Sequence, residues 1–148
     1  MEEFVLTHHL RQRFVQRTNK KYDHVQRCKN KQCLMCDSLL REIRIYANQH
    51  RRELDVTIRE YLGQAVECRW CLNNSEFMSW YYDKYGYDKK FRFLVHNGIL
   101  FVGVVDDGKC VLVTCVVAKT HIAGKQSLRP KFNKIKKKDD LGCLIVRN

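Results

Sequence analysis

The sequence predicts an α+β fold in which N-terminal helices pack on a C-terminal antiparallel β-sheet. Three observations predict it. Apolar residues recur at spacings of three and four through the first half of the chain, as in amphipathic helices. From Phe91 onward the chain changes to short runs rich in valine, isoleucine and phenylalanine, which is typical of strands. Asparagine-glycine and aspartate-glycine pairs separate these runs and favour tight hairpins.

A first helix is expected over residues 4–17, with Thr7 as a candidate N-terminal cap. Two stripes recur every four residues along it: an apolar stripe of Leu6, Leu10 and Phe14, and a basic stripe of His9, Arg13 and Arg17. At 3.6 residues per turn the stripes lie about 60° apart, so we expect the basic stripe to line a cleft between core and solvent. One imidazole and two guanidiniums suit a phosphate. The alternative is an ordinary solvated helix face.

Two further helical patterns follow a polar, cysteine-bearing segment at residues 18–37, which we expect to be a loop. The first pattern opens at Ser38 and continues through Leu39, Leu40, Ile43 and Ala47, and the second passes through Leu54, Ile58, Tyr61, Leu62 and Ala65. Residues 48–52 are read as a kink or break between them. Residues 68–74 are read as a turn, and residues 76–90 carry no clear secondary-structure pattern.

The C-terminal half predicts a three-stranded meander. Its strands are FRFLV, ILFVGVV and CVLVTCVVA, separated by Asn97-Gly98 and by Asp106-Asp107-Gly108. Residues 143–147 are a candidate fourth strand. We expect one domain over residues 1–148, with a cysteine-bearing insertion at about 24–74 and a basic stretch at about 119–138.

The charge of the chain points to a polyanionic partner. The formal net charge is +12, and Arg11 to Lys31 holds eight Lys/Arg against one acid, while Lys119 to Lys138 holds eight and no acid. Nucleic acid is the commonest partner of such patches.

Apolar runs are too short for a membrane span, so no membrane partner is expected. The first residues, MEEFVLTHH, lack a signal-peptide pattern, which favours a cytoplasmic protein.

Eight cysteines without a secretion signal favour free thiols or metal ligands over disulfides. Two Cys-x2-Cys pairs predict a closed, structural zinc site, and its expected ligands are Cys33, Cys36, Cys68 and Cys71. Cys28 is a spare that can replace one ligand, and His24 is a poorer substitute. The alternative is that all four cysteines are free or buried thiols. A four-cysteine site leaves no open position for catalysis.

Aromatic and basic side chains alternate between Trp80 and Lys90, and such a cluster can stack on unpaired bases. The alternative is that these aromatic residues belong to the core. The basic C-terminal stretch either adds phosphate affinity or is a solvated loop. We take as candidate RNA contacts Arg11, Trp80, Tyr82, Lys90, Arg92, Lys125 and Arg129.

Three features together resemble a known family. They are the His-x3-Arg-x3-Arg helix, the strand phrase NGILFVGVV, and the phrase VTCV followed by Ala123-Gly124-Lys125. This set is similar to the RelE-like ribonuclease group of the barnase–EndoU–colicin–RelE fold, and within it to the RegB-type endoribonucleases of phages. The resemblance covers about half of the chain, and the cysteine-bearing segment departs from the family pattern.

The resemblance implies metal-independent cleavage of messenger RNA, free or on the ribosome, by a toxin or a phage host-takeover factor. The ribose 2′-OH attacks the adjacent phosphate, which needs a base, cations and an acid. His9 is the candidate base or acid, with His8 as its competitor, and Arg13 and Arg17 are the phosphate clamp. Further candidates are Thr114 as a hydrogen-bond donor, and His96, Lys119 and His121 as the second proton-transfer group.

Two other classes of function remain open at this point. One is a non-catalytic, zinc-bearing regulator that binds RNA or the ribosome through the basic patches. The other is an inhibitor that binds an acidic host protein, which the charge would suit but which no motif demands.

Overall fold

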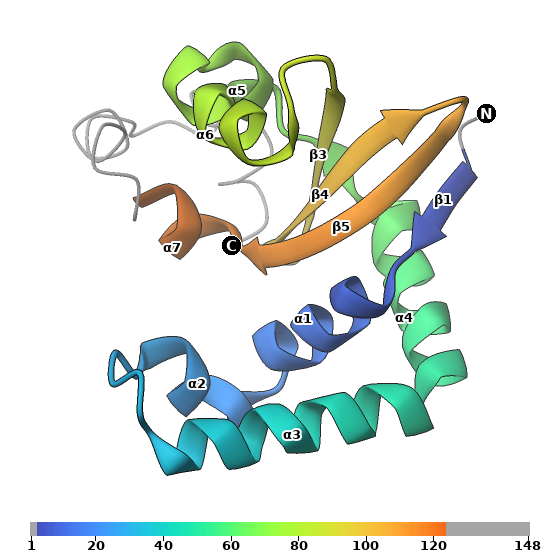
Figure 1. Ribbon diagram of the computed structural model, residues 1–148. Coiled ribbons are helices and arrows are strands. Elements are labelled where there is room, and N and C mark those ends of the chain that lie inside the picture. The colour runs from blue at the N-terminus through green and yellow to red at the C-terminus, as the bar shows by residue number, and fades with distance from the viewer. Residues whose placement is uncertain (1–2, 124–148) are drawn as a thin grey trace.

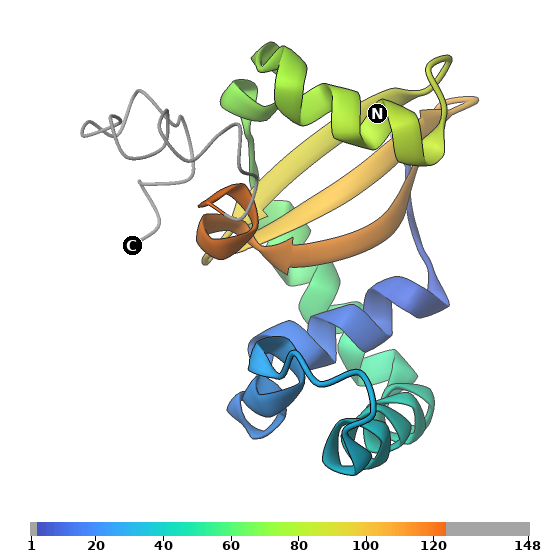
Figure 2. The same cartoon turned by 60° about the vertical axis from the view of Figure 1, so that its left-hand side comes forward.

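The computed structural model describes residues 3–123, and these form a sheet with helices on both faces (Figures 1 and 2). In spatial order the sheet contains β1 (Glu3–Leu6), β5 (Lys109–Val117), β4 (Ile99–Asp106), β3 (Lys90–His96) and β2 (Val66–Glu67). Four neighbouring strands pair antiparallel, while β1 pairs parallel with β5. The α+β class is confirmed. The candidate strand at residues 143–147 and most of the basic stretch lie outside the described residues.

The first element of the chain differs from our expectation. Residues 3–6 form a strand, and the first helix, α1 (His8–Thr18), begins later than predicted. Thr7 explains the change of direction, because its hydroxyl accepts a hydrogen bond from Leu10 N and donates one to Leu112 O at 2.7 Å. The predicted cap at Thr7 is therefore confirmed. The same residue anchors the start of α1 to β5.

Both predicted hairpin turns are present. Asn97 and Gly98 have φ values of 51° and 78°, and Asp107 and Gly108 have 48° and 75°. Positive φ at both central residues is the geometry of a two-residue type I′ turn, which matches the twist of the flanking strands. These turns set the antiparallel register of β3, β4 and β5.

Three long helices lie on one side of the sheet: α1 and α4 (Arg51–Gln64) contact it, and α3 (Leu34–Gln49) packs against these two helices (Figure 1). Their core includes the buried side chains of Leu10, Phe14, Ile43, Ile58 and Phe101. The predicted loop at 18–37 instead holds η1 (Lys20–Tyr22), α2 (Asp23–Arg27) and the start of α3. The predicted break near residue 50 is confirmed at His50, between α3 and α4.

Two helices that the sequence did not predict cover the opposite face: α5 (Arg69–Asn73) and α6 (Ser75–Tyr85). Asn74 caps α6 by accepting a hydrogen bond from Phe77 N, and Gly86, with a φ of 122°, follows its last turn. Phe77 and Tyr81 are buried against Phe93 of the sheet. The aromatic segment therefore forms a second core.

The far end of β5 lies between helices from both faces. β1 pairs only with Lys109 to Leu112, so the rest of β5 extends past the end of β1. From Thr7 the chain leaves the sheet and α1 runs along β5 instead (Figure 1). The strand leads directly into α7 (Ala118–Ala123).

Among the described residues, no helix combines the length and the apolar character needed to cross a membrane.

Candidate functional site

A cavity of about 230 Å³ opens beside the far end of β5, and we call it the basic cleft. Side chains from four elements line it: His9, Arg13 and Arg17 of α1, Trp80, Tyr81, Lys84 and Tyr85 of α6, Thr114 and Val116 of β5, and His121 of α7. The structure therefore brings five predicted catalytic residues into one cavity, together with Trp80 from the predicted RNA contacts. No aspartate or glutamate is among the lining residues described.

The basic stripe of α1 forms one wall of this cleft. Arg13 Nε donates a hydrogen bond to His9 Nε2 at 3.2 Å, and Arg13 Nη1 donates one to Gln16 Oε1 at 2.9 Å. Partial burial, followed by the charges of Arg13, Lys84 and Arg17, lowers the pKa of His9 below its usual 6.5. A neutral imidazole that accepts a hydrogen bond at Nε2 carries its proton on Nδ1. At neutral pH, His9 is therefore a base surrounded by cations.

Arg17 is a partly buried cation of the cleft. Its Nη1 donates to Gln26 Oε1 at 3.2 Å, while its Nε is buried and has no hydrogen-bond partner. Burial, and then the charge of Arg13, lowers its pKa, which reflects the cost of holding two guanidiniums together. A bound anion would lower that cost and accept a hydrogen bond from Nε.

Helix α6 forms the opposite, aromatic wall. Trp80 is 40% exposed, and Lys84 Nζ lies 5.1 Å from the centroid of its ring. Tyr81 is buried, and its Oη lies 2.7 Å from His121 Nε2. Burial raises the pKa of Tyr81, so its hydroxyl stays protonated and can hold the imidazole ring. Each of the two sequence interpretations therefore fits a different residue. Tyr81 belongs to the core, whereas Trp80 is exposed at the cleft, where it could stack on a base.

Three other candidate catalytic residues lie outside the basic cleft. His8 is exposed at the start of α1 and is not among the lining residues, so the geometry favours His9 over His8. The ring of His96 packs edge-on against Tyr61, with centroids 5.0 Å apart, on the sheet face that carries α1, α3 and α4. Lys119 is exposed on α7 and does not line the cleft.

The candidate RNA contact Arg11 has a structural role instead. It is 5% exposed, and its Nε and Nη2 bind the two carboxylate oxygens of Asp55 at 2.6 and 3.2 Å. This forked ion pair joins α1 to α4, so the guanidinium is not available to a phosphate. The prediction for Arg11 is wrong because it lies on the side of α1 that faces α4.

The remaining candidate contacts are spread over other surfaces. Arg92 Nε donates to Glu67 Oε1 at 2.9 Å on the face opposite α6. Tyr82 is half-buried and stacks on Tyr87 at 5.6 Å, and Lys90 is exposed at the start of β3. None of the three lines the basic cleft. Lys125 and Arg129 lie outside the described residues.

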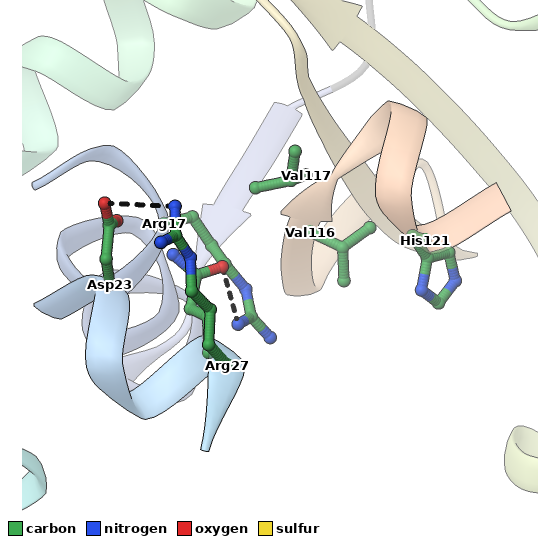
Figure 3. Close-up of a pocket in the computed structure, with 7 residues that line it drawn as sticks. Arg17, Asp23, Arg27, Val116, Val117 and His121 are labelled. Carbon is green, nitrogen blue, oxygen red and sulfur yellow. Dashed lines mark hydrogen bonds and ion pairs between the residues drawn. The ribbon is translucent and has the colours of Figure 1, made fainter. Parts of the chain in front are cut away.

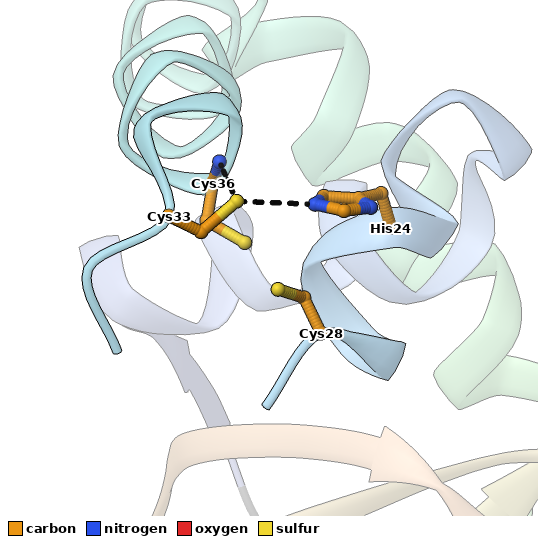
Figure 4. A group of neighbouring side chains, drawn as sticks. All are labelled: His24, Cys28, Cys33 and Cys36. Carbon is orange, nitrogen blue, oxygen red and sulfur yellow. Dashed lines mark hydrogen bonds between the residues drawn. The ribbon is translucent and has the colours of Figure 1, made fainter. Parts of the chain in front are cut away.

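A cluster of four potential metal ligands lies between the end of α2 and the start of α3, and Figure 4 shows it. The ligand atoms of His24, Cys28, Cys33 and Cys36 all lie within 4.8 Å of one another. His24 and Cys28 are four residues apart in the α2 segment, so one helical face carries both. Cys33 caps the start of α3, and Cys36 lies in its first turn. This cluster is close enough to bind a metal ion.

The electrostatics of the cluster favour a thiolate. Cys33 Sγ lies 3.3 Å from His24 Nε2 and accepts a hydrogen bond from Cys36 N at 3.4 Å. These two hydrogen bonds, the first being the larger effect, lower the pKa of the Cys33 thiol to about 6. The thiolate is the form of cysteine that binds metals.

The predicted ligand set is corrected by this geometry. Cys68 and Cys71 are buried in the core beneath α6, on the opposite face of the sheet from α3, and their Sγ atoms lie 2.9 Å apart. They therefore do not join Cys33 and Cys36. Cys28 and His24, the two substitutes that the sequence offered, complete the cluster instead. The compact spacing His24-x3-Cys28-x4-Cys33-x2-Cys36 is the signal that would have identified it.

Comparisons of the chain with protein-family models, with curated proteins and with solved structures find no match.

Proposed function

We propose that this protein is a metal-independent endoribonuclease that cleaves messenger RNA by attack of the ribose 2′-OH on the adjacent phosphate. One observation carries the proposal: the basic cleft gathers two imidazoles and two guanidiniums, with no carboxylate among its described lining residues. Guanidiniums favour phosphate, whereas a magnesium ion is bound through carboxylates. The donor set of the cleft therefore suits a phosphodiester better than a divalent cation.

Each reacting group has a candidate partner in the cleft. Neutral His9 accepts the proton of the 2′-OH as the new bond between O2′ and phosphorus forms. Arg13 and Arg17 stabilise the charge that develops on the phosphate oxygens. The bond between phosphorus and O5′ then breaks, and His121 gives a proton to that leaving oxygen. The products are a 2′,3′-cyclic phosphate and a free 5′-OH.

The cleft also supports a relationship to the RelE-like group. The basic helix α1 packs beside the sheet, and Thr114 of the sheet lines the same cleft as His9, Arg13 and Arg17, which is consistent with the arrangement that the resemblance implied. We propose that the protein acts in the cytoplasm, where thiols stay reduced, as a toxin or phage host-takeover nuclease. Ribosome binding is a further part of this proposal, because the basic surface suits a large RNA.

End-group analysis of cleaved RNA tests the proposed chemistry. Wild-type protein should cut RNA in magnesium-free buffer and leave 2′,3′-cyclic phosphate ends, while 2′-deoxy substitution at the cut nucleotide should block cleavage. The variant His9→Ala should lose about 10²- to 10⁴-fold in rate, the usual contribution of a general base. His8→Ala is the matched control, since it removes a neighbouring imidazole outside the cleft. Equal rates for the two variants would overturn the role of His9.

A non-catalytic RNA-binding protein is the second candidate. The exposed ring of Trp80, with Lys84 beside it, favours this function, because such a pair can stack on a base and attract its phosphate without chemistry. Under this alternative, wild-type protein would retain RNA intact, and the affinity would fall steeply with salt. Absence of cyclic phosphate ends together with such binding would favour it over the nuclease.

We further propose that the cysteine-histidine cluster holds a structural zinc ion. Three thiolates and one imidazole form a closed tetrahedral set of the kind that zinc prefers. Helix α2 has five residues, no buried side chain and no side-chain cap, so it has little stability of its own. A zinc ion bound by His24, Cys28, Cys33 and Cys36 would fasten α2 to the start of α3.

A further inference from the structure

A second and larger cavity, of about 360 Å³, adjoins the basic cleft, and Figure 3 shows the side chains that line it. Arg17, Val116 and His121 line both cavities. Beyond them, the second cavity continues to α2, which contributes Asp23, Gln26 and Arg27. A ligand bound in the basic cleft can therefore extend past Arg17 without leaving the protein surface.

Gln26 binds Arg17 to α2, the helix that also carries Arg27. Gln26 Oε1 accepts a hydrogen bond from Arg17 Nη1 at 3.2 Å, and Gln26 Nε2 donates one to Gln16 O at 3.1 Å. These two bonds tie α2 to α1. Arg27 follows Gln26 directly and lines the same cavity as Arg17, with His121 across from them (Figure 3).

The guanidinium of Arg27 is available to a ligand. Its side chain is 83% exposed, and its ion pair with Asp23 is long, with Nη2 and Oδ2 4.0 Å apart. Such an exposed pair contributes little to stability. A phosphate oxygen can therefore replace the Asp23 carboxylate at Arg27 at small cost.

We propose that Arg27 forms a second phosphate subsite, so that the protein binds two consecutive phosphates of a single RNA strand. This inference rests on the proposed RNA-binding function of the basic cleft. One phosphate lies between His9 and Arg17, and the next lies at Arg27, with Arg17 between the two. The exposed Trp80 stacks on an unpaired base beside the first phosphate. A base in that position requires a single strand rather than a duplex.

Asp23 sets the strength of this subsite. Its carboxylate is the one acidic group among the described residues that line either cavity, and it lies on the same helix as Arg27. A carboxylate beside a phosphate repels it. The variant Asp23→Asn removes that repulsion and should bind RNA more tightly than wild type.

Oligonucleotides that differ by one phosphate test the subsite directly. We would titrate wild-type protein with a 2′-O-methyl dinucleotide, which has one phosphodiester, and with the corresponding trinucleotide, which has two. The 2′-O-methyl group prevents attack, so binding is measured without cleavage. Arg27→Gln should weaken trinucleotide binding about tenfold, the typical loss for one charged hydrogen bond, and should leave dinucleotide binding unchanged.

Arg52→Gln is the matched control, because it removes the same charge from an exposed site on α4 outside both cavities. Equal trinucleotide affinity in the Arg27 and Arg52 variants would overturn the subsite. For a longer single strand, Arg27→Gln should also reduce the slope of log K against log salt by about 0.7, the value for one phosphate contact. An unchanged slope would contradict the proposal.

The same samples distinguish failure of the subsite from failure of the nuclease. Cyclic phosphate ends produced by wild type, combined with identical binding of both oligonucleotides by the Arg27 and Arg52 variants, would retain the nuclease and reject the subsite. Tighter trinucleotide binding that depends on Arg27, without any cleavage, would retain the subsite and reject the nuclease. Wild-type protein that binds neither oligonucleotide and leaves no cyclic phosphate ends on RNA would overturn both proposals.

Discussion

The hydroxyl of Tyr81 lies 2.7 Å from His121 Nε2, and this contact joins the buried face of α6 to the rim of the basic cleft. Tyr81 is 1% exposed and packs against Phe77 and Phe93 in the core, with ring centroids 5.1 Å from each. The ring of His121 is therefore held by a residue whose own position the core fixes. Tyr81 is a positioning residue in the proposed reaction, because it acts through His121.

Removal of that hydroxyl should slow cleavage and alter its pH dependence. We expect Tyr81→Phe to lower kcat about tenfold and to shift the limb of the pH–rate profile that reflects proton donation by His121. We also expect the variant to lose about 1 kcal/mol in the free energy of unfolding. Rate measurements over a range of pH check the first effect, and urea unfolding checks the second. Tyr22→Phe is the control, because Tyr22 is also buried and its hydroxyl bonds to Glu42 at 3.3 Å. An unchanged pH profile in Tyr81→Phe would reject the positioning role.

The pH dependence of cleavage should report the cationic surroundings of His9. The base is active when neutral, so kcat/KM should rise with pH through the pKa of His9, which lies below 6.5. Removing the positive charge of Lys84 should raise that pKa, because less repulsion opposes the protonated imidazole. The acid limb of Lys84→Gln should therefore move to higher pH. An NMR titration of His9 provides an independent check, and no movement of the limb would contradict the prediction.

The ion pair between Arg11 and Asp55 should matter for stability rather than for RNA binding. Arg11→Ala leaves the Asp55 carboxylate without its partner, and we expect a loss of about 2 to 3 kcal/mol in the free energy of unfolding. The double variant Arg11→Leu with Asp55→Leu should lose less, since no unpaired charge remains. Urea unfolding measures both. A folded Arg11 variant with a reduced salt dependence of RNA binding would instead restore Arg11 as a phosphate contact.

Zinc content should depend on the cysteines of the α2–α3 cluster and not on the pair beneath α6. We expect one zinc ion per chain by metal analysis, lost in Cys28→Ser and Cys33→Ser and retained in Cys68→Ser and Cys71→Ser. Removal of zinc with a chelator should also weaken RNA binding, because α2 carries Gln26, which holds Arg17. Retention of zinc by the Cys28 and Cys33 variants would show that the metal is bound elsewhere.

Local features of the fold could be predicted from the sequence where neighbouring residues decide the structure. The cap at Thr7 and the turns at Asn97-Gly98 and Asp107-Gly108 depend on side chains or φ values within a few residues. The strand at Glu3–Leu6 could not be recognised in the same way. Four residues carry little periodicity, and the partner of this strand lies more than a hundred residues away.

In the candidate site, too, the sequence predicted the features that depend on neighbouring residues and missed those that depend on distant contacts. The spacing of His9, Arg13 and Arg17 already placed them on one helical face, but only the folded chain brings Trp80, Thr114 and His121 opposite them. Helix α6 provides that second wall, and its sequence carried no clear helical stripe because aromatic residues lie on both its core side and its cleft side. Arg11 was expected to contact RNA, but it is paired with Asp55, and its place in the sequence did not indicate that partner.

The sequence by itself determined the α+β class, the basic stripe of α1 and the presence of thiols at metal-binding spacings. The tertiary structure decided which of those thiols meet, and which cations face an open cavity. The reason is geometric: the sheet separates Cys68 and Cys71 from Cys33 and Cys36, and it lets α1 and α6 meet only across the end of β5. Contacts of that kind depend on the path of the whole chain rather than on the spacing within any one segment.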